Sequence, residues 1–311
     1  MAKHSSGKQK KTPLARYTAI ALIAVAAVCT LLEALGIDVS GSINALLGGS
    51  SKKCSETVSV DFIDVGQGDC ILVQSDKGNM LIDCGEAEQA DKVINYIKSQ
   101  NITELDYVVA THPHSDHMGA MSSVISNFKV DNVIMPELPD KDVPTSRFFE
   151  KFLDACDKAN LSITNAETGM KIDLGEACAD VIAPPKSCNG ANDYSVGIVL
   201  THGENTFVFT GDAEKAGEEN MIKSGLLKDC DVYKAGHHGS NTSSSDELLD
   251  VIKPEYAVIM CGVNNSYGHP QDGALKRITK YTGKDNIYRT DLLGTIVFKS
   301  DGENLAVTSE R

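Results

Sequence analysis

Three histidines and one aspartate fall within six residues, directly after an apolar run, and no other feature constrains the fold as strongly. Residues 105–110 read LDYVVA, which is typical of a buried strand, and the next seven residues read THPHSDH. In an extended segment the side chains at i and i+2 point the same way, so His112 and His114 can bind one ion. Asp116 and His117 then turn toward a second ion. A solvated polar loop with incidental histidines is the alternative, but a cluster directly after a buried strand favours a site for two metal ions.

Two further strand ends carry an acid or histidines. Asp212 follows the apolar run TFVF. A carboxylate there could bridge two metals, although a Gly-Asp pair after a strand is also common as a turn or helix N-cap. His237 and His238 follow the run DVYKA. We expect one of this pair to bind metal and the other to face substrate, and the glycine after His238 favours His238 as the ligand.

Short apolar β runs alternate with helical patterns from Thr57 onward. Predicted strands lie at 58–65, 70–75, 79–85, 105–110, 130–135, 229–235, 256–262, 286–289, 293–299 and 303–308, with several more between 161 and 210. Predicted helices lie at 87–100, 145–159, 213–223, 243–252 and 271–281. Strands next to helices throughout indicate one α/β (α+β) domain over residues 56–311, with two mixed sheets covered by helices.

The first 55 residues have the composition of a membrane attachment. Residues 1–16 hold five Lys or Arg and no acid, and residues 17–32 hold no charge. The apolar stretch over 17–37 lies between the length of a cleaved signal and that of a spanning helix. We favour an uncleaved transmembrane anchor with a cytoplasmic tail, followed by a flexible Ser- and Gly-rich linker at 38–55. Cleavage after Gly36, which would give a secreted protein, and a buried core helix are the alternatives.

The charge of the remaining chain limits how it can bind polyanions. Five of the 29 Lys and Arg residues lie in the tail, so residues 17–311 carry 24 basic against 43 acidic side chains. Such a body repels nucleic acid through its mean field and does not bind it as a basic surface does. A phosphate-bearing substrate would therefore need bound cations to receive it.

The nine cysteines form no CxxC pair. We therefore predict no cysteine metal site and leave disulfides open. Imidazole and carboxylate ligands without thiolates suit Zn²⁺ or Mn²⁺.

The motifs, taken in order, resemble a known family. They read FIDVGQGD (62–69), LIDCG (81–85), THPHSDHMG (111–119), FTGD (209–212), AGHHGS (235–240) and YGHP (267–270). This pattern is similar to that of metallo-β-lactamase fold hydrolases, and more closely to the extracytoplasmic metal-hydrolase domain of ComEC-type DNA uptake proteins, over residues 57–300. The resemblance implies an αββα sandwich with two divalent ions at the sheet edges.

The resemblance also implies roles for residues around the metals. Asp83 would orient the ligands, and the turn that contains Gln67 and Asp69 would lie close to the ions. Asp64 and Asp69 have an alternative role as turn-capping acids. His269 could donate a proton to a leaving group or hold a phosphate, and a simple loop histidine is the alternative.

In two respects the sequence departs from the family pattern. Only one spanning segment is predicted, so the likeness does not extend to the channel-forming membrane domains. Relatives usually have another histidine between the HxHxDH window and the bridging aspartate. Here the single candidate is His202, which we expect in a hairpin rather than at the metals. Asn192 or Ser195 could line the site instead. The first metal position would then hold His112, His114 and the bridging aspartate with water, and would bind more weakly.

Two bound ions would lower the pKa of a shared water and hold an oxyanion, which suits attack on a phosphoester. A metal-activated hydroxide would be the nucleophile, and Asp116, His237 and His269 are the predicted catalytic residues. The leading hypothesis is a membrane-tethered phosphodiesterase with an extracytoplasmic catalytic domain, of the ComEC-type nuclease class acting on DNA. The alternatives are hydrolysis of a phosphocholine ester, lactone or lactam, or an inactive binding module. The expected partners are the membrane, through the N-terminal helix, and a phosphoester substrate, and protein partners are left open.

Overall fold

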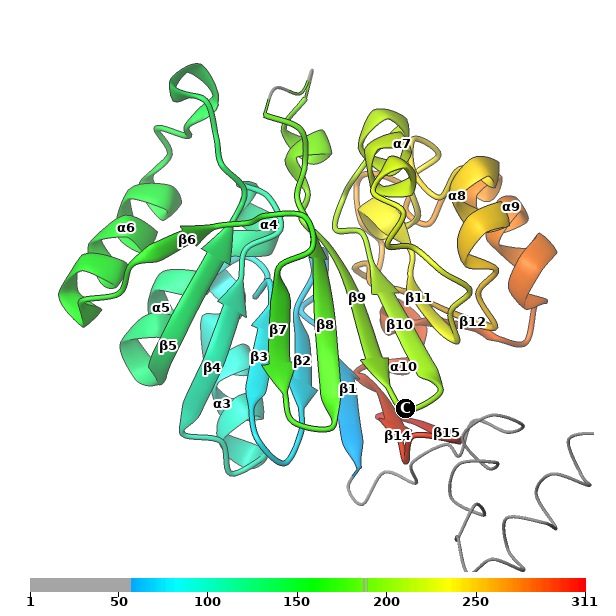
Figure 1. The fold of residues 1–311 in the computed structure, drawn as a ribbon, viewed down its shortest axis with the longest axis horizontal. Helices are drawn as coiled ribbons and strands as arrows, with labels where there is room; N and C mark the ends of the chain where they lie inside the picture. Colours follow the sequence, from blue (N-terminus) through cyan, green and yellow to red (C-terminus); the bar gives the residue numbers. More distant parts are fainter. Residues whose placement is uncertain (1–56, 187, 189) are drawn as a thin grey trace, which may run out of the picture. The chain divides into compact units, whose positions relative to one another are not determined.

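The computed structural model describes residues 57–186, 188 and 190–311 (Figure 1). The predicted tail at 1–16, the anchor or signal at 17–37 and the linker at 38–55 lie outside the described residues. Within the described part of the chain, no helix combines the length and apolar character needed to cross a membrane.

Two mixed β-sheets form the centre of the fold. The first contains, in spatial order, β15 (Leu305–Ser309), β14 (Ile296–Ser300), β1 (Val58–Phe62), β2 (Ile71–Gln74), β3 (Asn79–Ile82), β4 (Glu104–Val109), β5 (Lys129–Met135) and β6 (Ile163–Asn165). The second contains β13 (Ile287–Arg289), β12 (Tyr256–Ile259), β11 (Val232–Lys234), β10 (Asn205–Phe209), β9 (Gly197–His202), β8 (Ala177–Ile182) and β7 (Lys171–Leu174).

The two sheets share one plan. Strands β3 to β6 are parallel, as are β10 to β13, and the remaining neighbours pair antiparallel. Parallel neighbours need crossover connections, and helices supply most of them. The helices are α3 (Ala90–Ser99), α4 (Ser115–Met118), α5 (Met121–Asn127), α6 (Arg147–Ala159), α7 (Lys215–Lys223), α8 (Asp246–Ile252), α9 (Asp272–Thr282) and α10 (Thr290–Leu293). Short 3₁₀ turns are η1 (Ala87–Gln89), η2 (Asp140–Asp142), η3 (Ala191–Tyr194) and η4 (Gly236–Gly239).

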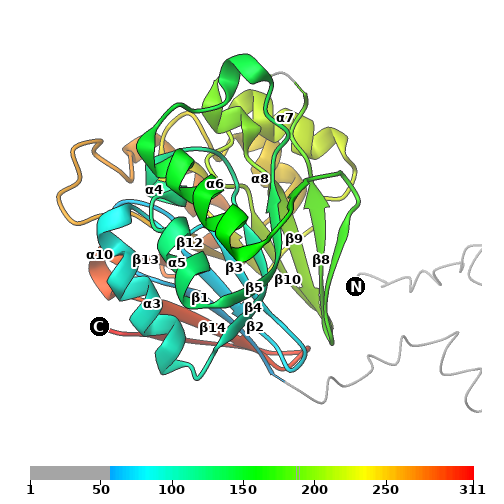
Figure 2. The same ribbon diagram turned by 90° about the vertical axis from the view of Figure 1, so that its left-hand side faces the viewer.

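Three apolar clusters hold the layers together. One cluster lies between the two sheets, where Phe62 of the first sheet contacts Phe209 of the second at a ring-centroid distance of 6.2 Å. A second cluster joins the first sheet to α3, α5 and α6, which lie together in front of that sheet in Figure 2. A third joins the second sheet to the α7–α9 side. The predicted αββα sandwich with two mixed sheets is therefore confirmed.

Three helices differ from the sequence-based expectation, the four-residue α4 and α10 and the longer α5. The sequence pattern predicts no helix at Met121–Asn127, but α5 forms there. Its serines and its β-branched Val124 and Ile125 have modest helix propensity, so local preference is weak. The side chains of Met121, Val124 and Ile125 are buried in the cluster with α3 and α6. Tertiary packing therefore decides this helix.

The strand directions place the candidate site residues at one edge of each sheet. Strands β3 and β4 run parallel to each other, as do β10, β11 and β12, so within each group the C-terminal ends lie at the same edge. The loops after these strands carry Asp83, the histidine window, Asp212 and the His237-His238 pair. A backbone hydrogen bond of 2.9 Å from Val196 N–H to the carbonyl of Thr111 joins the two edges.

Candidate metal centre

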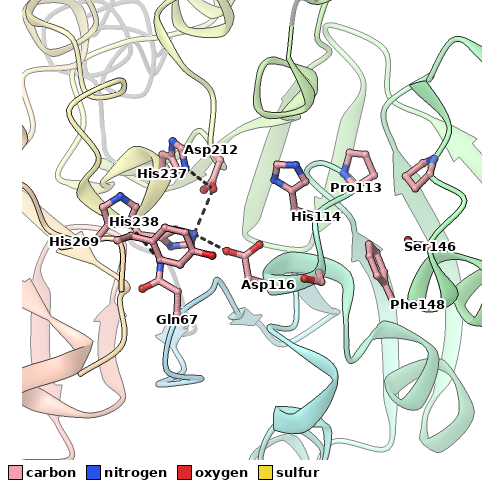
Figure 3. Close-up of a pocket in the computed structure, with 13 residues that line it drawn as sticks. Gln67, Pro113, His114, Asp116, Ser146, Phe148, Asp212, His237, His238 and His269 are labelled. Carbon is pink, nitrogen blue, oxygen red and sulfur yellow. Dashed lines mark hydrogen bonds and ion pairs between the residues drawn. The ribbon is translucent and has the colours of Figure 1, made fainter. Parts of the chain in front are cut away.

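Asp212 lies at the centre of a group of imidazoles. Its Oδ2 atom is 3.2 Å from Nε2 of His117, 3.3 Å from Nε2 of His238, 3.8 Å from Nε2 of His237 and 4.0 Å from Nε2 of His112. These side chains come from three different loops, and Figure 3 shows His237, His238 and Asp212 converging at the floor of a pocket. One carboxylate oxygen thus faces four ring nitrogens, as a bridging ligand would.

A buried carboxylate fixes the orientation of His117. Nδ1 of His117 lies 2.7 Å from Oδ2 of Asp83, and the Thr111 backbone and side chain donate to the same carboxylate at 2.8 and 2.6 Å. Because Asp83 accepts all three hydrogen bonds, His117 carries its proton on Nδ1 and presents the other nitrogen to Asp212. Asp83 therefore contacts the group that the resemblance implies it orients.

His238 and His112 are oriented in the same way. Nδ1 of His238 lies 2.9 Å from the carbonyl oxygen of Met260, to which it can donate only. Nδ1 of His112 lies 3.4 Å from Oγ of Ser195, and that hydroxyl also accepts a 3.0 Å hydrogen bond from the backbone N–H of Asp212. Ser195 thus lies directly behind the site and contacts both the ring and the central aspartate.

The donor atoms form two sets that have the spacing of metal ligands. Two ligand nitrogens on one tetrahedral ion are separated by about 3.3 Å, because Zn–N bonds are about 2.0 Å long. Nε2 of His112 and Nδ1 of His114 are 3.1 Å apart. Oδ2 of Asp116 is 3.2 Å from Nε2 of His238, which in turn is 3.3 Å from Oδ2 of Asp212.

Several of these buried atoms have no hydrogen-bond partner. Within the described residues they include Nε2 of His117, Nε2 of His238 and Oδ1 of Asp212. An unpaired buried polar atom is costly, and a cation would satisfy these atoms together. The residues present therefore fit divalent metal. The buried side chains of Asp69, His117, Asp212 and His238 each place one ligand-type atom within 4.8 Å of the others.

Asp69 belongs to a buried ion pair behind this cluster. Its Oδ2 is 2.6 Å from Nζ of Lys234, a lysine with no exposed side-chain surface, and its Oδ1 is 3.3 Å from Nδ1 of His238. Asp69 therefore faces Nδ1 of His238, whereas Asp116 faces Nε2 of the same ring. Gly68 makes this position possible, since a Cβ there would lie 2.3 Å from the carbonyl oxygen of Asp116.

Neighbouring carboxylates and burial shift the pKa values of the histidines in this cluster. Burial opposes a charge on His117, but Asp212 and Asp83 outweigh it and raise its pKa well above the usual value. His238 shows the same balance, and its pKa is also raised, with Asp212 as the main favourable charge. Burial lowers the pKa of His112. Without metal, the centre thus holds protons on His117 and His238, which a cation must displace on binding.

A pocket of about 450 Å³ opens over the centre, lined by Gln67, Pro113, His114, Ser115, Asp116, Pro144, Ser146, Phe148, Asp212, His237, His238, Tyr267 and His269. His269 and Gln67 lie on one side and Phe148 and Pro113 on the other (Figure 3). His237 is partly open to this space, and Nδ1 of its ring is 3.2 Å from Oγ1 of Thr242. A substrate in the pocket would contact the open side of the centre.

Two further predicted residues, Asn192 and Asp64, do not line the pocket. Asn192 Nδ2 is 3.2 Å from Glu214 and 3.5 Å from Nδ1 of His237. Asp64 accepts from the backbone N–H of Gly66 and its other oxygen is 3.2 Å from Arg311, which are the contacts of a turn-capping acid.

His202 lies away from the metal centre. It ends β9, which runs antiparallel to β10, so it lies at the opposite edge of the sheet. Its Nδ1 is 2.8 Å from the hydroxyl of Ser300. His202 is therefore a hairpin residue, as expected.

Sequence reasoning missed Lys234, Thr111 and Tyr267. A lysine within a predicted strand, three residues before a His-His pair, was the available signal for Lys234, because lysine is rarely buried unless paired. The contacts of Thr111 with Asp83 depend on tertiary structure and leave no sequence signal. All seven cysteines of the described residues are free thiols, and the remaining two lie outside those residues.

Comparisons with known proteins identify relatives of the chain. The family model described as "Metallo-beta-lactamase superfamily" matches residues 63–263. The chain is 28% identical over 259 residues to "ComE operon protein 3" of Bacillus subtilis, covering 77% of this chain and 33% of that protein. It is 28% identical over 296 residues to "Competence protein ComA" of Neisseria gonorrhoeae, covering 89% and 38%. The chain thus spans about a third of the length of these relatives.

Solved structures share the fold at low identity. YhfI, a metallo-beta-lactamase fold protein from Bacillus subtilis, matches with a TM-score of 0.53 and 13% identity, over 78% of this chain and 100% of that chain. CmlA, a diiron beta-hydroxylase from Streptomyces venezuelae, matches with a TM-score of 0.50 and 12% identity, over 75% and 52%. These likenesses concern the fold alone.

Proposed function

The chain belongs to the metallo-beta-lactamase superfamily, and from this membership we propose that it is a metal-dependent phosphodiesterase that hydrolyses DNA. The observation that carries the proposal is the convergence of four imidazole Nε2 atoms on Oδ2 of Asp212, within 4.0 Å. Such a carboxylate can bridge two divalent ions, and a pair of ions suits an in-line displacement at phosphorus.

The proposed ligands form two groups around the bridging aspartate. His112 and His114 would hold one ion, and Asp116, His117 and His238 the other. Bound Zn²⁺ or Mn²⁺ would supply the Lewis acid that activates water and neutralises the phosphoryl oxygens. The chain's own contribution is to fix these side chains through hydrogen bonds behind them, so that little reorganisation is needed when substrate arrives.

His269 is suited to hold a phosphoryl oxygen. The Oε1 atom of Gln67 accepts from the backbone N–H of Gly262 at 3.2 Å, so its Nε2 points as a donor to Nδ1 of His269, 3.4 Å away. The proton of His269 is then on Nε2. Burial and the neighbouring histidines lower the pKa of His269 to about 4. A neutral imidazole at pH 7 is a poor proton donor in catalysis but a good hydrogen-bond donor to an oxyanion.

His237 takes the substrate side of the His-His pair in this proposal. Its side chain is 22% exposed, whereas that of His238 is 1% exposed. A partly exposed imidazole at the pocket floor is more accessible to a substrate oxygen than a buried one. His238 is accordingly the proposed ligand of the pair.

DNA is the proposed substrate because of the names of two relatives. Two relatives are named as competence or recombination proteins, "Competence protein ComA" and "Recombination protein 2" of Haemophilus influenzae. The acidic body cannot attract DNA through its mean field, and divalent ions at the pocket floor would provide the attraction locally. We further propose that residues 17–37 anchor the chain in the cell membrane and that the hydrolase domain is extracytoplasmic.

The test is hydrolysis by the full chain with Mn²⁺ or Zn²⁺. Substrates are single-stranded DNA, double-stranded DNA and bis-p-nitrophenyl phosphate. We expect cleavage by the wild type and its loss in His114→Ala and Asp212→Asn. Asp64→Asn is the matched control, because Asp64 caps a turn outside the centre. Turnover of a lactone or lactam without cleavage of any phosphodiester would contradict the proposal.

A further inference from the structure

Tyr267 presents a large aromatic surface at the pocket. The residue is 65% exposed, although its ring lines the pocket over the metal centre. One face of the ring stacks on His269, with ring centroids 5.6 Å apart and an interplanar angle of 19°. The outer part of the ring remains open to solvent. Burying such a ring against a planar partner would be favourable, and no described residue covers it.

The loop that carries Tyr267 is fixed by Asn265. Its Nδ2 donates to the carbonyl oxygens of Gly262 and His269 at 2.9 and 2.6 Å, and its Oδ1 accepts from the backbone N–H of His269 at 2.9 Å. A ring on a loop held in this way loses little conformational freedom when it binds a partner.

The ring is close to the reacting centre. His269 lies between Tyr267 and the metal centre, with its ring centroid 5.6 Å from that of Tyr267 and 6.0 Å from that of His238. A planar group stacked on the free face of Tyr267 would therefore be separated from His238 by two rings, those of Tyr267 and His269. This spacing is compatible with the base of a nucleotide that flanks the phosphate that is cleaved.

The other walls of the pocket explain why such a surface is needed. Among the described residues that line the pocket, none is Lys or Arg, and Pro113, Pro144 and Phe148 make the opposite wall apolar. Bound ions can hold one phosphate, but the chain offers no cation in the pocket for the neighbouring nucleotides. Stacking on aromatic side chains is the usual alternative source of affinity for single strands, and it tolerates any base.

We propose that Tyr267 is a stacking surface for an unpaired nucleobase next to the phosphodiester that is cleaved. The inference rests on the proposed function and specifies the substrate as nucleic acid with at least one unpaired base at the pocket. Tyr267 is a positioning residue in this proposal. It binds the base, while the chemistry takes place at the metal centre.

The test compares two strands and three variants of the full chain in the presence of Mn²⁺. One strand is oligothymidylate, and the other has the same length with stable tetrahydrofuran abasic residues. The variants are Tyr267→Ala, Tyr267→Phe and, as the matched control, Leu292→Ala, which removes another side chain that is 60% exposed but does not line the pocket.

We expect Tyr267→Ala to raise KM for oligothymidylate by about tenfold or more, with a smaller change in kcat, since base–aromatic stacking contributes strongly to strand binding. Tyr267→Phe and Leu292→Ala should resemble the wild type. The abasic strand should be cleaved with a high KM that Tyr267→Ala does not change further.

Several results would overturn the inference in distinguishable ways. If both strands were cleaved with the same KM, or if Tyr267→Ala affected both equally, the proposed stacking on Tyr267 would be contradicted. The proposed phosphodiesterase activity would still stand. Failure to cleave either strand, with hydrolysis of double-stranded DNA or bis-p-nitrophenyl phosphate retained, would overturn the inference alone. Failure to hydrolyse any of these substrates would contradict the proposed function as well.

Discussion

At the scale of single residues, hydrogen bonds behind the ligands set the geometry of the centre. Asp83 receives Nδ1 of His117 at 2.7 Å and both donors of Thr111. Ser195 connects His112 to the backbone of Asp212. These contacts leave the Nε2 atoms directed at one carboxylate oxygen. The chain's own hydrogen bonds thus hold these side chains in place.

The first prediction concerns Asp83. Asp83 has φ +55°, a conformation that asparagine tolerates well, so Asp83→Asn preserves the backbone while weakening the hold on His117. Metal affinity should fall by roughly 10–100-fold, as is usual when a partner of a ligating histidine is lost. Titration against a competing chelator measures it. Asp64→Asn should leave affinity unchanged, and equal affinities for wild type and Asp83→Asn would refute the role.

The second prediction concerns the buried Lys234–Asp69 pair. Lys234→Met leaves the carboxylate of Asp69 buried without its partner, and the free energy of unfolding should fall by about 3–5 kcal/mol. Adding Asp69→Asn to this variant should restore part of the loss, because no unpaired charge then remains. Denaturant unfolding of the single and double variants measures the coupling.

Lys171→Met is the matched control for that prediction, since Lys171 pairs with Asp180 on the surface, with 64% of the lysine side chain exposed. It should change stability little. Strictly additive effects of Lys234→Met and Asp69→Asn would contradict the pairing.

Residue patterns predicted the ligands better than their partners. His112, His114, Asp116 and His117 share one short window, whereas Asp212 and His238 follow apolar strands, a position that alone is weak evidence for a ligand. Their roles as metal ligands stay predictions. Lys234, Thr111 and Tyr267 were missed. Their roles come from contacts between loops distant in sequence, and a single sequence does not record such contacts.

At the scale of elements, the loop between β11 and α8 carries the strain of the site. His237, His238 and Ser244 adopt positive φ angles of 49°, 55° and 55°. Glu218 of α7 accepts hydrogen bonds from the backbone N–H groups of Ser244 and Ser245. Arg277 of α9 donates to the carbonyls of the same loop. Two helices therefore hold a backbone conformation that is locally unfavourable.

The third prediction tests this support. Arg277→Met removes three hydrogen bonds to the loop, so we expect faster hydrogen exchange in residues 236–245 and weaker metal binding, while the sheets keep their protection. Lys276→Met, on the exposed part of the same helix, is the control. Unchanged exchange in the loop of Arg277→Met would show that other contacts suffice.

Most elements followed from the sequence, because alternating apolar runs and helical spacing mark strands and helices locally. The short helices α4 and α10 were not predicted, and neither was α5 at Met121–Asn127, which has weak local preference and is decided by packing on the first sheet. The pairing of two sheets into one sandwich was expected from the family resemblance, since local pattern does not state which strands are neighbours.

At the scale of the whole molecule, binding of metal and binding of protons compete. In the metal-free protein the pKa values of His117 and His238 are raised, so their protonation stabilises the fold fully below about pH 6.5, the usual histidine value. This contribution is lost as the pH rises through the raised values. Bound cations displace these protons and therefore stabilise the protein more at high pH.

The fourth prediction follows from the direction in which metal binding and stability change with pH. Addition of a chelator should lower Tm more at pH 8 than at pH 6, as measured by thermal unfolding of the full chain. Asp212→Asn is the control, because its Tm should hardly respond to the chelator at either pH. An equal or larger decrease at pH 6 would contradict the competition.

The most direct test of the central claim measures metal content and hydrolysis together. Full-length protein stripped of metal would be titrated with Mn²⁺ or Zn²⁺, and bound ions per chain and the rate of phosphodiester cleavage would be recorded at each step. We predict that cleavage is absent in the stripped protein, rises as about two ions bind, and does not appear in Asp212→Asn. Cleavage by the stripped protein, or saturation below one ion per chain, would contradict a metal centre built around Asp212.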